Sequence, residues 1–180
     1  ELSGKEFDGE ITIENYKEEL GFEVVPEVQS LGHVQWLTLP HPEIAEAVKH
    51  NVTVEDTRNE DLRPSEEYFH CYCPSNEDSY KLIFDVMDEI IEVTKPQRFV
   101  HIGHDEVYQI GVCPKCRETD PAELFRADVM RIYEYLSARG IKTMMWSDML
   151  QPVTRYKTPR AAESLPRDIV MLDFIWYFHF

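Results

Sequence analysis

The most informative stretch of the sequence runs from His101 to Glu106 and ends in two adjacent acidic residues, Asp105 and Glu106. The pair follows a short apolar run that is typical of a buried strand. In a partly dry cleft, different surroundings can separate two carboxyl pKa values, so that one group stays ionised while the other keeps its proton. Acid and base steps in glycosidic bond cleavage need that combination. A solvated acidic turn is the plainer interpretation, but the strand and the two histidines favour a site.

Polar and aromatic side chains also gather where the other predicted strands end. The carboxyl ends of parallel strands meet at one edge of an open sheet or at one mouth of a barrel. We therefore expect these side chains to lie near the acidic pair, although each aromatic residue or histidine could instead fill a core. The candidates are Glu27, His33, His104, Trp146, Asp148, Trp176 and Tyr177.

The elements that must carry these residues alternate between strands and amphipathic helices. One helix is expected to begin at Ser75, with Asp78 in its first turn, and another at Asp120 with Pro121 in its first position. Such alternation requires parallel strands joined by right-handed crossovers, which is the α/β class. We expect strands over residues 22–28, 98–102, 142–146 and 169–176, and a weaker helix over 161–165.

Length and composition limit the classes of protein. The 180 residues include 34 acidic and 18 basic ones, for a formal charge of −16, and no basic run, so a nucleic-acid partner is not expected. No apolar stretch is long enough for a membrane span, and no signal peptide is recognisable. A complete eight-unit barrel takes about 250 residues, so the chain looks like part of one. Its start at Glu1 rather than Met indicates a processed, trimmed or partial chain.

The four cysteines form two close pairs, and the second pair has the Cys-x-x-Cys spacing of zinc sites. The pairs lie in loops after two neighbouring predicted strands, so the loops could meet and hold a structural zinc ion. Disulfides and free thiols are the alternatives. The pattern suggests reduced thiols or a metal rather than a secreted scaffold, which favours the cytoplasm. The expected zinc ligands are Cys71, Cys73, Cys113 and Cys116.

Two sequence motifs, which follow each other along the chain as they do in the family, resemble those of family 20 glycoside hydrolases, the β-N-acetylhexosaminidases. Residues 101–106 resemble the family's His-x-Gly-x-Asp-Glu signature, and residues 25–33, Val-Pro-Glu-Val-Gln-Ser-Leu-Gly-His, resemble its third strand. Residues 146–150 and the pair Trp176-Tyr177 are similar to later strand ends in the branch that contains hexosaminidase D. The resemblance implies that residues 1–180 are one partial catalytic TIM-barrel domain, a (β/α)8 barrel of which about strands 3 to 6 are present.

The resemblance also implies an activity, the removal of terminal β-linked N-acetylhexosamine from a glycan or glycoside without a cofactor. Glu106 would act as general acid and then base, and His33 would tune it through a hydrogen bond. Asp105 would orient the substrate's own 2-acetamido group, which attacks the anomeric carbon to give an oxazolinium intermediate. The substrate-binding candidates are Tyr177, Trp146, Trp176, His104, Glu27 and Asp148.

Two other functions remain open. A non-catalytic glycan-binding module would keep the aromatic walls without turnover. A metal-dependent hydrolase would use His101, His104, Asp105 and Glu106 as ligands, but strand alternation would point these four residues in different directions. Motifs of the family's first two and last two strands are not identifiable, so a longer protein or a second chain is expected to complete the barrel.

Overall fold

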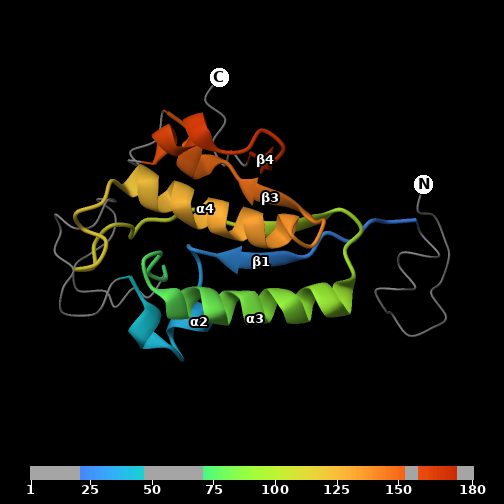
Figure 1. Cartoon of the computed structure of the whole chain (residues 1–180), viewed down its shortest axis with the longest axis horizontal. Helices are drawn as coiled ribbons and strands as arrows, with labels where there is room; N and C mark the ends of the chain where they lie inside the picture. Colours follow the sequence, from blue (N-terminus) through green and yellow to red (C-terminus); the bar gives the residue numbers. More distant parts are fainter. Residues whose placement is uncertain (1–20, 47–70, 153–157, 174–180) are drawn as a thin grey trace, which may run out of the picture.

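The computed structural model describes residues 21–46, 71–152 and 158–173. Within them, four strands form a single parallel sheet in the order β1-β2-β3-β4. Figure 1 labels three of these strands, β1, β3 and β4. None of the described helices is both long and apolar enough to cross a membrane. The strands are β1 (Glu27–Ser30), β2 (Phe99–Gly103), β3 (Lys142–Trp146) and β4 (Val170–Leu172), and the α-helices are α2 (Gln35–Thr38), α3 (Glu77–Thr94) and α4 (Pro121–Ser137). Short 3-10 helices span Pro42–Ile44, Asp148–Leu150 and Pro159–Ser164.

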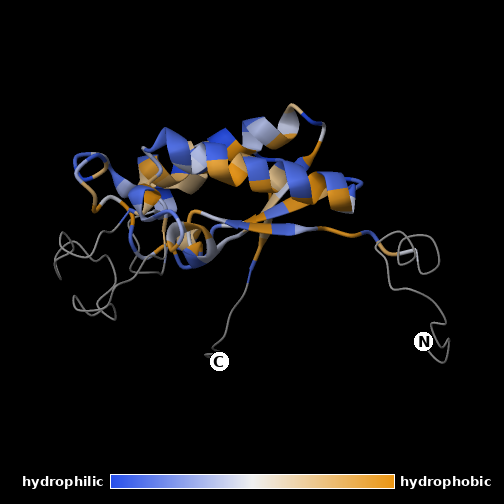
Figure 2. Cartoon of the chain, turned by 90° about the horizontal axis from the view of Figure 1, so that it is seen from below, coloured by the Kyte–Doolittle hydropathy of each residue, from blue (hydrophilic) through white to orange (hydrophobic). Residues whose placement is uncertain are grey.

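Both long helices cover the same face of the sheet, which Figure 2 shows from the side. The strand side chains on this face alternate with those on the other and are buried, as Val28, Val100, Ile102 and Met145 are. Together with the inward side chains of α3 and α4, such as Phe125, they form the core. This arrangement places helices outside a curved sheet, as in an α/β barrel.

The opposite face of the sheet carries the chemically interesting side chains. Parallel register places Glu27 beside His101, and β3 pairs with β2 so that His101 lies beside Met144. By alternation, Gln29 and Trp146 share this face. No helix among the described residues covers it, so it corresponds to the interior of a barrel.

The starts of the two long helices test the capping predictions. α4 begins as predicted, with the Asp120 side chain accepting a hydrogen bond from the Ala122 amide at 2.8 Å. α3 begins one residue later than predicted, because Asn76 rather than Ser75 accepts from the Asp78 amide. The Ser75 hydroxyl instead lies 3.2 Å from the Cys116 sulfur.

Several element boundaries differ from the sequence prediction. β2 covers Phe99–Gly103 rather than residues 98–102. β1 covers Glu27–Ser30 rather than residues 22–28, so the apolar run before it is extended chain outside the ladder. The predicted helix at 161–165 is a 3-10 helix over Pro159–Ser164, a short element that begins at a proline. β4 covers Val170–Leu172, and the part of its predicted range beyond residue 173 lies outside the described residues.

Candidate active site

Three of the predicted site residues meet where β1 and β2 end. The Nε2 atom of His33, which follows β1, lies 3.0 Å from Oε2 of Glu106 and 3.4 Å from Oδ2 of Asp105, both of which follow β2. The three side chains are partly exposed, from 17% for Asp105 to 36% for Glu106. One imidazole is therefore within reach of both carboxylates at the edge where a substrate can approach.

Strained backbone explains how two successive carboxylates reach the same histidine. In a regular strand, neighbouring side chains point to opposite faces. Here Gly103, His104 and Glu106 have φ of 71°, 71° and 47°, which ends the alternation, and His33 has φ of 53°. Non-glycine residues in the left-handed region cost free energy and concentrate at functional sites. This strain, together with the converging polar groups, marks the edge as a site.

Gln29 fixes Asp105 from the neighbouring strand. Its Nε2 atom donates to Oδ1 of Asp105 at 2.6 Å and to the carbonyl of Gly32 at 3.1 Å. Two glycines give this arrangement its space. A Cβ atom on Gly103 would lie 2.4 Å from Oε1 of Gln29, and one on Gly32 would lie 2.5 Å from the carbonyl oxygen of Asp105. The orientation of Asp105 therefore depends on both loops packing without side chains at these points.

Asp148, which follows β3, supports the acidic pair from the other side. Its Oδ2 atom accepts a hydrogen bond from the Glu106 amide at 2.9 Å, which holds the strained backbone of Glu106. Burial raises the pKa of Asp148 to about 6, with the Asp105 and Glu106 carboxylates adding to the effect. Its other oxygen, Oδ1, is buried and has no hydrogen-bond partner within the part of the chain that the structure describes. Asp148 thus contacts the backbone of the site.

Glu27, Trp146 and His101 form a second polar group on the open face of the sheet. Burial raises the pKa of Glu27, and a hydrogen bond from Trp146 lowers it in part. The rings of His101 and Trp146 meet edge to face at 4.8 Å between centroids. Burial lowers the pKa of His101 to about 4, so its ring is neutral at neutral pH. Trp146 is thus held in place by two neighbours.

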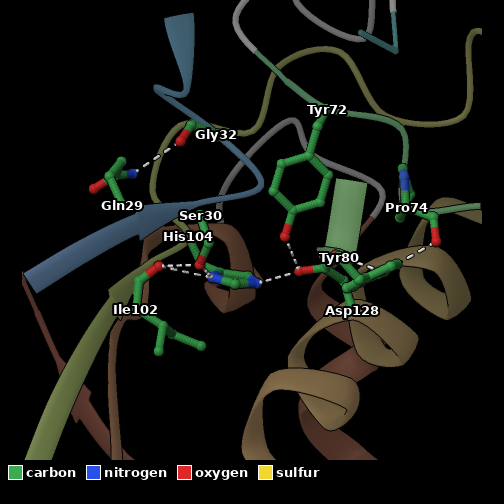
Figure 3. Close-up of polar contacts among 9 residues, drawn as sticks. All are labelled: Gln29, Ser30, Gly32, Tyr72, Pro74, Tyr80, Ile102, His104 and Asp128. Carbon is green, nitrogen blue, oxygen red and sulfur yellow. Dashed lines mark hydrogen bonds and ion pairs between the residues drawn. The ribbon is translucent and has the colours of Figure 1, made fainter. Parts of the chain in front are cut away.

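His104 lies away from the acidic pair, on the helix side of the sheet (Figure 3). Its ring is fully buried, with Nε2 at 2.8 Å from Oδ2 of Asp128 and Nδ1 at 3.1 Å from the carbonyl of Ile102. Asp128 on α4 also accepts from the hydroxyls of Tyr72 and Tyr80, at 3.1 and 2.8 Å. In this position His104 contacts protein only and joins the strand end to α4.

Two predicted site residues, Trp176 and Tyr177, lie outside the described residues. The ligands suggested for a metal-dependent hydrolase are not gathered by the described structure. His104 faces Asp128, whereas Asp105 and Glu106 face His33. Among the described residues, the group of side chains that could hold a metal ion lies elsewhere.

The side chains that could hold a metal ion differ from the four predicted zinc ligands in one residue. Cys73, Cys113 and Cys116 come together, but the fourth residue is Glu46 rather than Cys71. Cys71 is buried beside the backbone of Tyr108 and Gln109, outside the group. All four cysteines are free thiols. Burial raises the pKa of Cys113 to about 12, whereas hydrogen bonding with Cys73 and Ser75 lowers that of Cys116 to about 7.

Sequence reasoning missed Asp128 and Glu46 as members of these arrangements, and it placed Gln29 at a strand end without giving it a role. Gln29 carried a usable signal, because it shares the face of Glu27 by alternation and stands at a strand end. Asp128 lies within an apolar stripe of α4, and a buried acid at such a position predicts a partner. Glu46 had no local signal, since its partners are distant in sequence.

Comparisons with known proteins agree with this geometry. The family model "Glycosyl hydrolase family 20, catalytic domain" matches residues 9–171. Hexosaminidase D of Bos taurus is 28% identical over 139 residues, covering 73% of this chain and 36% of that protein. The solved β-N-acetylhexosaminidase of Bacteroides fragilis aligns with a TM-score of 0.61 and 22% identity, over 91% of this chain and 31% of that one. The Flavobacterium johnsoniae chitobiase structure aligns with a TM-score of 0.57 and 27% identity, over 74% of this chain and 20% of that one.

The chain thus spans about a third of the length of the first two of these relatives and a fifth of the chitobiase. The structural likeness confirms the predicted fold class, part of an α/β barrel. The family match extends over most of the sequence and includes both acidic residues and His33. The chain belongs to glycosyl hydrolase family 20.

Proposed function

We propose that the full-length protein is a retaining β-N-acetylhexosaminidase that removes terminal β-linked N-acetylhexosamine by substrate-assisted catalysis. The observation that carries the proposal is the convergence of Asp105 and Glu106 on His33 at the ends of adjacent strands. Family membership supports the reaction class. The neighbouring positions of the two acids suit this route, because no protein nucleophile has to stand across the sugar ring from the acid.

In the first step, Glu106 gives its proton to the glycosidic oxygen as the bond from that oxygen to C1 breaks. The carbonyl oxygen of the 2-acetamido group bonds to C1, which forms a cyclic oxazolinium ion. The Asp105 carboxylate accepts a hydrogen bond from the acetamido N–H and offsets the positive charge that develops. Gln29, at 2.6 Å from the other oxygen of Asp105, keeps that carboxylate oriented.

In the second step, Glu106 takes a proton from water while the water oxygen bonds to C1 and the acetamido oxygen leaves. The product keeps the β configuration, because C1 is attacked twice from opposite sides. His33 contacts Oε2 of Glu106 at 3.0 Å and so helps to orient this carboxyl group in both steps. Asp148 holds the Glu106 backbone in place.

The open face of the sheet supplies the sugar-binding surface in this proposal. Trp146 and, outside the described residues, Trp176 would pack against the acetamido group, and Tyr177 would donate a hydrogen bond to its carbonyl. Glu27, held by Trp146, lies on the same face and would contact sugar hydroxyls. Residues 1–180 would form part of the catalytic domain, with the rest of the barrel supplied by a longer protein or a second chain.

Release of a chromogenic aglycone from an N-acetyl-β-glucosaminide by the full-length protein tests the proposal. Glu106→Gln keeps the shape and removes the acid, so kcat/KM should fall about 10²–10⁴-fold. Glu43→Gln is the matched control, because Glu43 is an exposed glutamate whose carboxylate contacts only His41 among the described residues, and it should leave the rate unchanged. Binding of N-acetylglucosamine oligosaccharides without any turnover by the wild type would instead indicate a glycan-binding module.

A further inference from the structure

A compact group of four buried side chains lies apart from the acidic pair. One ligand atom each from Glu46, Cys73, Cys113 and Cys116 lies within 4.8 Å of all the others. The four residues are between 0% and 8% exposed. They come from two loops, because Glu46 and Cys73 follow β1 in the chain and the Cys-x-x-Cys pair follows β2.

Glu46 is the unusual residue of the group, because a carboxylate is rarely buried in an apolar core without a partner. Its side chain is 1% exposed, and its Oε1 atom accepts hydrogen bonds from the amides of Val112 and Cys113 at 2.8 and 3.2 Å. Its Oε2 atom is buried, and no described residue forms a hydrogen bond with it. Among the described residues no Lys, Arg or His pairs with it. A buried carboxylate without a cation is costly, so a cation beside it would remove a large penalty.

The sulfur distances fit a metal centre better than a disulfide. The Cys73 sulfur lies 3.5 Å from the sulfurs of both Cys113 and Cys116. A disulfide needs about 2.05 Å between its sulfurs. Two thiolates bound tetrahedrally to one zinc ion, at about 2.3 Å each, stand about 3.8 Å apart. Cys73 is therefore placed to share one ion with both partners, after a small adjustment.

The chemistry of the donor set selects the ion. Three soft sulfurs exclude Ca²⁺ and Mg²⁺, which take oxygen ligands. Cysteine sulfur and carboxylate oxygen are both zinc ligands, and four protein ligands close a tetrahedral site with no position for water. We propose that Glu46, Cys73, Cys113 and Cys116 bind one structural zinc ion that joins the loop after β1 to the loop after β2.

Metal binding would displace the three thiol protons and leave a centre of charge −2, from three thiolates and one carboxylate around Zn²⁺. The amides of Val112 and Cys113, which already point at Glu46, help to offset this charge. The centre would fix two loops that begin at the strand ends carrying His33 and Glu106. Its role is to order the site rather than to take part in the reaction.

Metal analysis of the full-length protein, purified under reducing conditions and supplied with zinc, tests the proposal. The wild type should contain about one zinc ion per chain. Cys116→Ser should lose it, and Glu46→Gln should bind it more weakly in a chelator competition because the charged ligand is gone. Cys71→Ser is the matched control, since Cys71 is an equally buried neighbouring thiol outside the group, and it should keep the ion.

Cobalt substitution of the wild type gives a second measurement that depends on no variant. Co²⁺ in the proposed site should show the visible absorption of a tetrahedral centre and thiolate charge-transfer bands, and zinc should bleach both. The proposal is overturned if reduced wild-type protein takes up no stoichiometric zinc, or if Cys116→Ser retains it. Disulfides among these cysteines in freshly purified protein, seen by non-reducing mass spectrometry, would also overturn it. None of these outcomes depends on glycosidase activity.

Discussion

Replacing Asp128 by Ala would remove the acceptor at the centre of the buried network in Figure 3. Asp128 joins four parts of the molecule, because it lies on α4 and binds Tyr72, Tyr80 of α3 and His104 at the end of β2. Asp128, His104 and Tyr72 have no measurable exposure, so the donors that lose their acceptor are out of contact with bulk water. Tyr80 keeps a second acceptor, the carbonyl of Pro74 at 3.0 Å.

The magnitude follows from the number of donors left without a partner. Asp128→Ala leaves two buried donors without an acceptor, the Tyr72 hydroxyl and Nε2 of His104. Each such donor costs about 1–3 kcal/mol of stability. We therefore expect the free energy of unfolding to fall by about 2–6 kcal/mol, the sum for the two donors. Tyr72→Phe removes one donor and leaves Asp128 two others, so it should cost only about 1 kcal/mol.

Urea unfolding of the full-length protein and its variants measures these differences. Tyr80→Phe removes the second hydroxyl, and combining it with Asp128→Ala completes a double-mutant cycle. The cycle should show a coupling energy of about 0.5–3 kcal/mol. An Asp128→Ala cost no larger than that of Tyr72→Phe would refute the reasoning, because it would show that the carboxylate does not bind several buried donors at once.

Two further predictions concern the site itself. The raised pKa of Asp148, about 6 against an ordinary 3.8, means that the folded state holds its proton longer than the unfolded state. The free energy of unfolding of the wild type should therefore fall by about 3 kcal/mol as pH rises from about 4 to 6. Urea titrations at several pH values should show this fall for the wild type and not for Asp148→Asn. Parallel curves of unfolding free energy against pH for the two proteins would contradict the assignment. Gly103→Ala and Gly140→Ala both place Ala at similar φ, 71° and 73°, so each should cost about 1–2 kcal/mol. Only Gly103→Ala adds a Cβ atom against Gln29, so it alone should lower kcat/KM, by more than about tenfold. An equal effect of both substitutions on kcat/KM would show that the Gln29 contact is irrelevant.

Much of the fold could be predicted because local signals agreed with each other. β3 has the predicted bounds, Lys142–Trp146, and α4 begins at the predicted Pro121 behind its Asp120 cap. The rule that parallel strands end at one edge was enough to bring His33 to the acidic pair. In each case a residue type and its neighbours in sequence sufficed.

The remainder depended on contacts between distant residues. Ser75 and Asn76 are both good caps, and the choice of Asn76 reflects the Ser75 hydroxyl lying beside Cys116. His104 follows the last residue of β2, where the left-handed backbone of Gly103 and His104 ends the strand, so its partner Asp128 could be identified only from the structure. The joining of Glu46 to three cysteines likewise required the loops to be placed in space.

The most direct test of the central claim compares two glycosides that differ only at C2 of the sugar. If the substrate's acetamido oxygen is the nucleophile and Asp105 orients it, the full-length protein should hydrolyse the 2-acetamido β-glycoside and leave the 2-hydroxy analogue essentially untouched. Asp105→Asn should slow the first reaction by about 10²–10³-fold, since it removes the charge that faces the oxazolinium ion. Comparable rates on the two glycosides, or an Asp105→Asn variant with full activity, would contradict the account.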